Sequence, residues 1–426
     1  MHRTTRRPLL LLGAGDREYD AYSLLQIAAT HPVVLVDRAA PAWIRPYLAG
    51  EVAVELGDTA HVIQAVTAFT IEHDVGGVLT YSVRHAELAA RLTQQLAHLD
   101  LPGNAPAAVA ACHDEVGFRR MLDEHAFPSA QSFTADAEDS AIEAARLLGY
   151  PVALRAPGAD TPGPGLRAHG DHEVRAAFRR ICRDDALVLG PFATTGAVVE
   201  EVGLDGPAVG VEAVVTAPTD VRTVAITRTS VSPQLSGQVV GYSVDAHDEL
   251  LHDAAIGQCV TQAVTACGIT TGVVHAELRL SSRGPRLAAL SACLADNLVP
   301  LLVARALGIN LPQVAAALAT GTTPALAAVR KGAAAIRFLY PNATGRIKQL
   351  RPLTDFATQP WLDRFVWTRQ PGNAVLAPPT SGLEDRLAHC VVTGADPAEC
   401  ASWLDLVASH ATARIEYSLS SPLGVR

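Results

Sequence analysis

The sequence predicts an α/β protein in which a parallel sheet comes first and antiparallel strands follow. Short apolar runs at Leu9–Leu12, Val33–Val36 and Gly77–Thr80 alternate with helical stretches over Tyr19–Ala28 and Val62–His73. Strands that alternate with helices are typical of a parallel sheet. A second set of apolar runs is expected to form an antiparallel sheet: Val198–Glu201, Val209–Val215, Val221–Thr227, Val273–Leu280 and Leu287–Leu290.

Composition limits the classes of function that the chain can have. The 426 residues are 49% hydrophobic and 18% charged, enough for sizeable cores in about three domains. The formal net charge of −9 argues against a nucleic-acid partner or an anionic membrane surface. The seven cysteines contain no C-x-x-C pair, so no zinc or disulfide framework is predicted, and scattered thiols fit a reducing cytoplasm. The first apolar run is too short for a signal peptide or a membrane span, so we expect a cytoplasmic protein.

Glycine and proline mark where the first elements begin and end. Gly13-Ala-Gly15 follows the first strand but lacks the third glycine of a dinucleotide fingerprint, so we interpret it as a turn that the fold requires. Another strand of the first sheet is expected at Glu51–Glu55. Helices are expected at Val109–Ala126, before Pro128, and at Glu143–Leu148, before Gly149-Tyr-Pro151.

The rest of the chain supplies the other elements and three expected domains. Val152–Leu154 is a predicted strand, and Ala156–Gly165, with three prolines and three glycines, is a predicted loop. His252–Cys267 fits a helix that Gly268 closes. The C-terminal strands are expected at Ala334–Leu339 and Cys390–Thr393, with a helix at Pro397–Ser409. We place the domains at 1–112, 113–325 and 326–426, the middle one divided into a lid (113–190) and a nucleotide half (191–325).

Five segments in this order resemble the ATP-grasp superfamily, most closely the carboxylate–amine ligases that include the L-amino-acid ligases. The segments are Leu148-Gly-Tyr-Pro-Val-Ala-Leu-Arg155, Val199-Glu-Glu-Val202, Gly210-Val-Glu-Ala213, Gly272-Val-Val-His-Ala-Glu277 and Gly284-Pro-Arg-Leu287. The resemblance covers nearly the whole chain. It implies an N-terminal α/β domain, a small lid, an antiparallel nucleotide domain and a C-terminal α+β domain. It also implies ATP and magnesium as cofactors and small carboxylic or amino acids as substrates.

Several positions depart from the family pattern. Asp114 is followed by Glu115 where the family has a lysine, and Arg155 replaces the second family lysine. Residues 1–330 contain no lysine, so no shift of the alignment restores either one. The phosphate-covering loop at 157–165 carries three prolines, which remove amide donors. Ala289, Ser291 and Cys293 stand where the family has an acid, an asparagine and an arginine.

Other family positions are kept. Glu200 and Glu201 end a strand where relatives contact the adenine, and Glu212 matches an acid near the ribose; exposed strand-end acids are the alternative. Glu277 occupies the position of the first metal ligand and would be a weak magnesium site on its own. His275 resembles a family histidine that helps to bind substrate, although a lone histidine on an apolar strand is more often a hydrogen-bonded core residue. Glu277, His275 and Arg155 are therefore the catalytic candidates.

Three further features receive structural interpretations. His169, His172 and Glu173 lie close in sequence, but their spacing suits a solvated turn better than a metal site. Cys293 has Ala292 and Leu294 as neighbours, which favours an inert buried thiol over a reactive one. The tryptophans at 361, 367 and 403 are most simply core aromatics.

Two hypotheses of function follow. In the first, the chain is an ATP-grasp homologue whose Mg-ATP residues are replaced, and it serves as a non-ligating binding or accessory protein in small-molecule (natural-product) biosynthesis. In the second, it is a divergent ligase that joins a small acid to an amine through an acyl-phosphate, or it performs ATP-independent chemistry in the same site. A protein partner or a homodimer is compatible with either hypothesis.

Overall fold

The fold was analysed in a computed structural model of the chain. It describes residues 6–113, 118, 132–155, 166–189, 196–201, 207–232, 235, 238–281, 284–351, 353, 356, 358–378 and 381–416. Four sheets are present among these residues, and the largest has eight strands. The α/β class is confirmed, and among the described residues the parallel sheet is accompanied by three antiparallel sheets where the strands from Val198 to Leu290 were expected to form one.

The N-terminal unit is the parallel sheet that the sequence predicts. Its strand order is β3-β2-β1-β4, and every neighbouring pair is parallel. Gly13 and Gly15 after β1 have φ of +81° and +64°, which confirms a turn that favours glycine. The elements are β1 (Leu9–Leu12), α1 (Arg17–Ala28), β2 (Val33–Asp37), β3 (Leu48–Ala53), α2 (Thr59–Glu72), β4 (Gly77–Leu79), α3 (Val83–Gln95) and α4 (Pro106–His113).

A smaller antiparallel sheet, which we call the lid sheet, carries two helices and includes a strand at 197–201, beyond the expected lid boundary at 190. Its order is β5-β8-β6-β7. The sequence analysis grouped Val198–Glu201 with the large antiparallel sheet; that was wrong, because β8 pairs with β5 and β6. The helix expected at Glu143–Leu148 begins earlier, and most of the segments 109–126 and 156–165 lies outside the described residues. The elements are β5 (Ser132–Ala135), α6 (Glu138–Leu148), β6 (Val152–Arg155), β7 (Leu166–Ala168), α7 (Asp171–Leu189) and β8 (Ala197–Glu201).

The central sheet joins the middle and the end of the chain. Its order is β13-β12-β9-β10-β11-β14-β18-β16, antiparallel throughout, so the C-terminal strands extend the sheet that β9 to β13 begin. The strands are β9 (Ala208–Ala217), β10 (Asp220–Ser232), β11 (Gln238–Asp245), β12 (Gly272–Ser281), β13 (Gly284–Ser291), β14 (Ala333–Leu339), β16 (Leu362–Trp367) and β18 (Ala388–Gly394).

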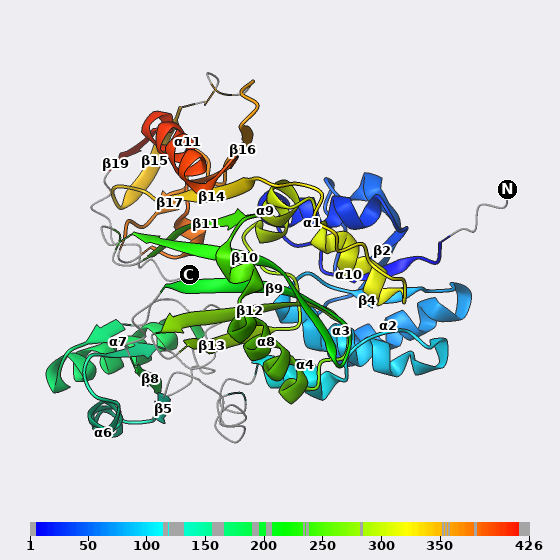
Figure 1. The fold of residues 1–426 in the computed structure, drawn as a ribbon, viewed down its shortest axis with the longest axis horizontal. Helices are drawn as coiled ribbons and strands as arrows, with labels where there is room; N and C mark the ends of the chain where they lie inside the picture. The colour runs from blue at the N-terminus through cyan, green and yellow to red at the C-terminus, as the bar shows by residue number, and fades with distance from the viewer. Residues whose placement is uncertain are drawn as a thin grey trace.

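Helices cover both faces of the central sheet (Figure 1). On one face Val211 and Ile226 pack with α8 (Ala254–Cys267) and α4. On the other face Val214 and Phe338 share a core with β1, α1, α9 (Val299–Ala306) and α10 (Leu311–Ala319). Because side chains alternate along a strand, the even-numbered residues of β9 face the second core. No single described helix is long and apolar enough to span a membrane.

The C-terminal segment adds a helix and a small sheet. α11 (Pro397–His410) packs on β14 and β18, and Trp361 and Trp403 stack there at 4.6 Å, which confirms their core role. The remaining strands, in the order β17-β15-β19, are β15 (Gly345–Leu350), β17 (Ala374–Val375) and β19 (Ala413–Glu416). Four short 3₁₀ turns complete the described elements: η1 (Arg45–Tyr47), η2 (Ala97–Leu99), η5 (Glu249–His252) and η6 (Leu383–Asp385).

The junction between β11 and β14 predicts a glycine requirement. A Cβ at Gly241 would lie 2.1 Å from the carbonyl oxygen of Ile336, whereas a Cβ at Gly257 in α8 would meet nothing within 4 Å. We expect Gly241→Ala to lower the free energy of unfolding by about 1–3 kcal/mol through overpacking. Gly257→Ala is the matched control and should be neutral or stabilising. Urea unfolding followed by circular dichroism measures the stability of both variants. Equal stability would contradict the close packing of Gly241 in β11 against Ile336 in β14.

Candidate functional site

A buried carboxylate and an imidazole form the middle of the site. Glu212 of β9 and His275 of β12 are cross-strand partners, and their side chains point to the same face. Nδ1 of His275 donates to Oε1 of Glu212 at 2.8 Å, and the hydroxyl of Thr227 donates to the same oxygen at 3.2 Å. Glu212 is fully buried, and its Oε2 has no hydrogen-bond partner among the described residues. Glu212 is therefore not an exposed strand-end acid.

His275 carries a positive charge at neutral pH. Burial by itself lowers the pKa of His275, but the Glu212 carboxylate outweighs burial, and Glu277 adds to it, so the pKa rises to about 9. Nε2 of His275 lies 3.9 Å from Oε1 of Glu277, whose side chain is 38% exposed. A Cβ at Gly210 would lie 2.7 Å from Cε1 of His275, so glycine makes room for the ring. His275 is thus an imidazolium between two acids, more than a core histidine.

Asp296, in the turn after β13, acts on the charge of His275, and Asp20 of the N-terminal unit lies near Asp296. The backbone N–H of Asp16 donates to Asp20 at 2.8 Å. Burial raises the pKa of Asp20 to about 6, and Asp296 contributes to the rise. Asp296 is exposed and begins a turn in which Asn297 and Leu298 have φ of +57° and +64°. Two successive non-glycine residues in the left-handed region are strained, and such strain gathers at functional sites.

An arginine from the C-terminal segment completes the arrangement. Nη1 of Arg386 donates to Oδ1 of Asn297 at 2.6 Å, and its Nε donates to the hydroxyl of Tyr340 at 3.1 Å. Its guanidinium lies 3.6 Å from the ring centroid of Phe338. Burial raises the pKa of Tyr242 to about 12, and both Glu277 and Arg386 act on that hydroxyl. We call Glu212, Tyr242, His275, Glu277, Asp296 and Arg386 the central polar cluster.

The other predicted site residues lie on the lid sheet. Arg155 ends β6, and its guanidinium binds Oε1 of Glu200 on β8 through Nε at 3.1 Å and Nη2 at 2.9 Å. The side chains of Arg155 and Glu200 are 14% and 21% exposed. Glu201 follows on the same strand and pairs with Val152. The structure therefore brings Arg155 and Glu200 together, and separately Glu212, His275 and Glu277.

The described residues do not fit a resident magnesium ion. Among them, no three histidine, cysteine, aspartate or glutamate side chains lie close enough together to hold a metal. The one acid in a family metal position, Glu277, has the imidazolium of His275 beside it, and that charge repels a divalent cation. Arg155, the cation expected at the phosphates, is bound to the acid expected at the adenine. The substitutions at 114–115 and the loop 157–165 lie outside the described residues.

The structure also decides the minor candidates. His169 lies in the bend before α7, and Glu173 in the first turn of α7 accepts from the backbone N–H of His169. The stretch is the exposed turn that was expected, and it leads into a helix that was not. Cys293 is buried, its thiol donates to the carbonyl of Thr80 at 3.6 Å, and burial raises its pKa, which confirms the inert interpretation.

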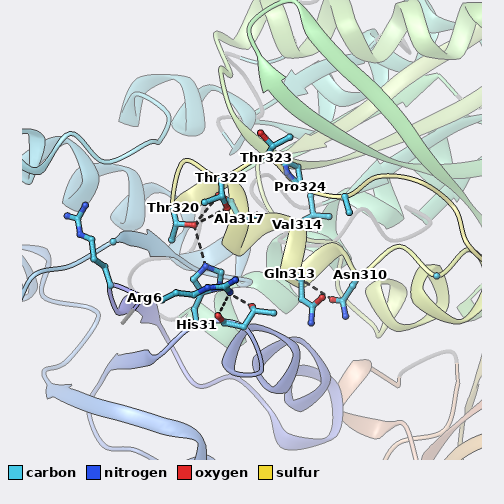
Figure 2. Close-up of a pocket in the computed structure, with 15 residues that line it drawn as sticks. Arg6, His31, Asn310, Gln313, Val314, Ala317, Thr320, Thr322, Thr323 and Pro324 are labelled. Carbon is cyan, nitrogen blue, oxygen red and sulfur yellow. Dashed lines mark hydrogen bonds between the residues drawn. The ribbon is translucent and has the colours of Figure 1, made fainter. Parts of the chain in front are cut away.

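A pocket elsewhere in the described chain takes no part in this cluster. It has a volume of about 640 Å³ and is lined by Arg6, His31 and Gln313 among others. Figure 2 shows His31 and Thr320 joined across it, their nearest side-chain atoms 3.4 Å apart. None of the six residues of the central polar cluster lines this pocket.

Sequence reasoning missed Tyr242 and Arg386. Tyr242 lies on β11, a strand that the sequence analysis did not predict. Arg386 precedes β18 and is 3% exposed, the burial expected of an apolar residue. A local signal existed only for Arg386, which stands between Asp385 and Leu387 at the start of an apolar strand where arginine is unusual.

The charge on His275 can be measured directly. We expect its ring to titrate with a pKa of about 9, and Glu212→Gln to lower that pKa because the main stabilising carboxylate is lost. Since the folded pKa exceeds the ordinary 6.5, the stabilisation is complete below pH 6.5 and is lost as the pH rises through about 9. Nuclear magnetic resonance of the imidazole, assigned with His275→Asn, gives the value. Glu87→Gln on α3 is the control, and an unshifted pKa in Glu212→Gln would contradict the pairing.

Comparison with known proteins gives one family match and a set of similar structures. The family model "L-amino acid ligase C-terminal domain 2" matches residues 337–416. No curated protein sequence matches significantly. The L-amino acid ligase from Bacillus licheniformis superposes with a TM-score of 0.78 at 17% identity, over 97% of this chain and 100% of that one. Phosphoribosylglycinamide synthetase from Anaerococcus prevotii gives 0.71 at 17% identity, over 96% and 100%.

A third similar structure contains a nucleotide. Carboxyaminoimidazole ribonucleotide synthase from Aspergillus clavatus, complexed with ATP, gives a TM-score of 0.67 at 13% identity, over 96% of this chain and 100% of that one. At such identities the superpositions establish the fold, and function has to be argued from the site. This chain therefore has the ATP-grasp fold of the carboxylate–amine ligases, with a C-terminal segment that matches the L-amino acid ligases.

Proposed function

We propose that this protein binds a small amino acid or carboxylic acid at the central polar cluster without joining it to an amine through Mg-ATP. In this proposal it is a cytoplasmic accessory protein in small-molecule biosynthesis, acting with a protein partner or as a homodimer. The absence of disulfides among its seven cysteines supports the compartment.

The observation that carries the proposal is that the charged groups of the site pair with one another. Acyl-phosphate chemistry needs cations that face the phosphates and acids that hold the metal. Here Arg155 is bound to Glu200 at 2.9 Å, and His275 lies between Glu212 and Glu277. These pairs take up the charges that a nucleotide would use. Lysine is absent from residues 1–330, so the sequence offers no second phosphate-binding cation of that kind.

The accessible acids support an amino-acid ligand. Glu277 keeps 38% of its side chain exposed, and Asp296 is exposed at the strained turn. Both act on the hydroxyl of Tyr242, so they lie near one another. Two solvent-accessible carboxylates close to one another can bind the ammonium group of an amino acid, because charge-assisted hydrogen bonds to that group are short and strong.

Calorimetric titration with ATP tests the loss of ligation. We expect no magnesium-dependent ATP binding tighter than about 0.1 mM, which corresponds to roughly 5.5 kcal/mol of binding free energy. The Aspergillus clavatus synthase that was solved with ATP is the positive control. Binding tighter than that value, strengthened by magnesium, would overturn the proposal.

A divergent ligase, or an enzyme that uses the same site without ATP, is the second candidate. The exposed carboxylate of Glu277 beside the imidazolium of His275 favours it, because such a pair can exchange a proton with a bound substrate. The test is ADP release with pairs of amino acids and, separately, loss of the amino acids without ATP. Glu277→Ala should abolish either activity if the candidate is right, whereas Glu87→Ala on α3 should not. An activity that is unchanged in Glu277→Ala eliminates this candidate.

A further inference from the structure

Within the described part of the chain, the buried cation Arg386 has no counter-ion. The residue is 3% exposed, and among the described residues no carboxylate lies within ion-pair distance of its guanidinium. The contacts that it makes are with neutral groups: the amide of Asn297, the hydroxyls of Tyr340 and Tyr19, and the ring of Phe338. The neighbouring acid, Asp385, accepts from the backbone N–H groups of Leu376 and Gly382 instead. A buried charge that is stabilised only by dipoles and a ring costs folding free energy.

A second buried polar group lies beside it without a partner. His389 is fully buried, and neither Nδ1 nor Nε2 has a hydrogen-bond partner among the described residues. Its ring centroid lies 5.1 Å from that of Tyr19 on α1. Burial lowers the pKa of His389 to about 4, and Arg364 and Arg386 add to the effect, so the ring is neutral. His389 therefore supplies no negative charge to balance Arg386.

The position of Arg386 relates it to the accessible acids. It binds Asn297, the residue that follows Asp296, and both it and Glu277 act on the hydroxyl of Tyr242. Asn297 and Tyr340, which receive its hydrogen bonds, are only partly buried. The guanidinium of Arg386 is therefore buried beneath the partly exposed side chains of Asn297 and Tyr340. Arg386, Glu277 and Asp296 all lie near the hydroxyl of Tyr242. The positive charge of Arg386 is complementary to the carboxylate of an α-amino acid, and the two acids are complementary to its ammonium group.

We propose that Arg386 binds the carboxylate of an α-amino acid whose ammonium group lies at Glu277 and Asp296. This inference rests on the proposed function and names the group that holds the ligand's acid. A carboxylate supplies two acceptors to the planar guanidinium fork and the missing negative charge. The contacts with Asn297 and Phe338 hold the fork in place before the ligand arrives.

The first test measures the unliganded protein. Because the charge is unpaired without ligand, Arg386→Met should raise the melting temperature of the free protein. Arg337→Met, on β14 of the same sheet, removes an arginine that is paired with Asp405, and it should leave the melting temperature unchanged or lower it. A lower melting temperature for Arg386→Met, or failure to fold, would mean that Arg386 is a structural brace, and it would overturn the inference.

The second test measures binding. The common L-amino acids are screened by thermal shift at millimolar concentration, and the strongest is titrated together with its amide. We expect the wild-type protein to bind the acid at least about tenfold more tightly than the amide, since a charge-assisted pair is lost. Arg386→Met and Arg386→Gln should remove this preference, Arg386→Lys should keep part of it, and Arg337→Met all of it.

The outcomes separate the two proposals. If the wild-type protein binds an amino acid and the Arg386 variants bind it equally well, the inference is wrong and the proposed function stands. If the wild-type protein binds none of the amino acids, the proposed function fails in its amino-acid form, and this inference fails with it. Loss of the acid-over-amide preference together with a raised melting temperature supports both.

Discussion

The ion pair between Glu212 and His275 is the constraint on which the site depends. Glu212 is fully buried, and a buried carboxylate is unfavourable without a partner. His275 on the neighbouring strand supplies that partner and becomes charged in return. Breaking a buried pair by removing one member leaves an uncompensated charge. The register of β9 against β12, and with it the position of Glu277, is thereby coupled to one hydrogen bond of 2.8 Å.

The charged groups on the lid sheet are paired as well. The superposed ligases and synthases share the architecture, but architecture does not specify chemistry. In this chain Arg155 is bound by Glu200 on the lid sheet, and the imidazolium stands beside the acid in a metal position. Arg386, which precedes β18, has no carboxylate partner among the described residues and donates to Asn297 instead.

Local pattern predicted the elements that have a strong period and clear ends. The strands at Leu9–Leu12 and Val33–Val36 and the helix closed by Gly268 formed as expected, because apolar runs and a left-handed glycine are local signals. α3, α7 and β11 were missed. α7 is rich in charged residues, and β11 is mostly half-buried, so neither has a continuous apolar run. Val198–Glu201 was a correct strand in the wrong sheet, because sheet membership is not local.

The sequence by itself determined the fold class and one part of the site. His275 and Glu277 are two residues apart on a strand, so the alternation of side chains places them on one face. The tertiary structure alone decided that Arg155 meets Glu200 and that Arg386 meets Asn297, contacts across 45 and 89 residues. Such contacts depend on which strands become neighbours: β6 and β8 in the lid sheet, and β14 and β18 where the C-terminal segment extends the central sheet. The spacing of residues along the chain does not specify which strands pair with one another.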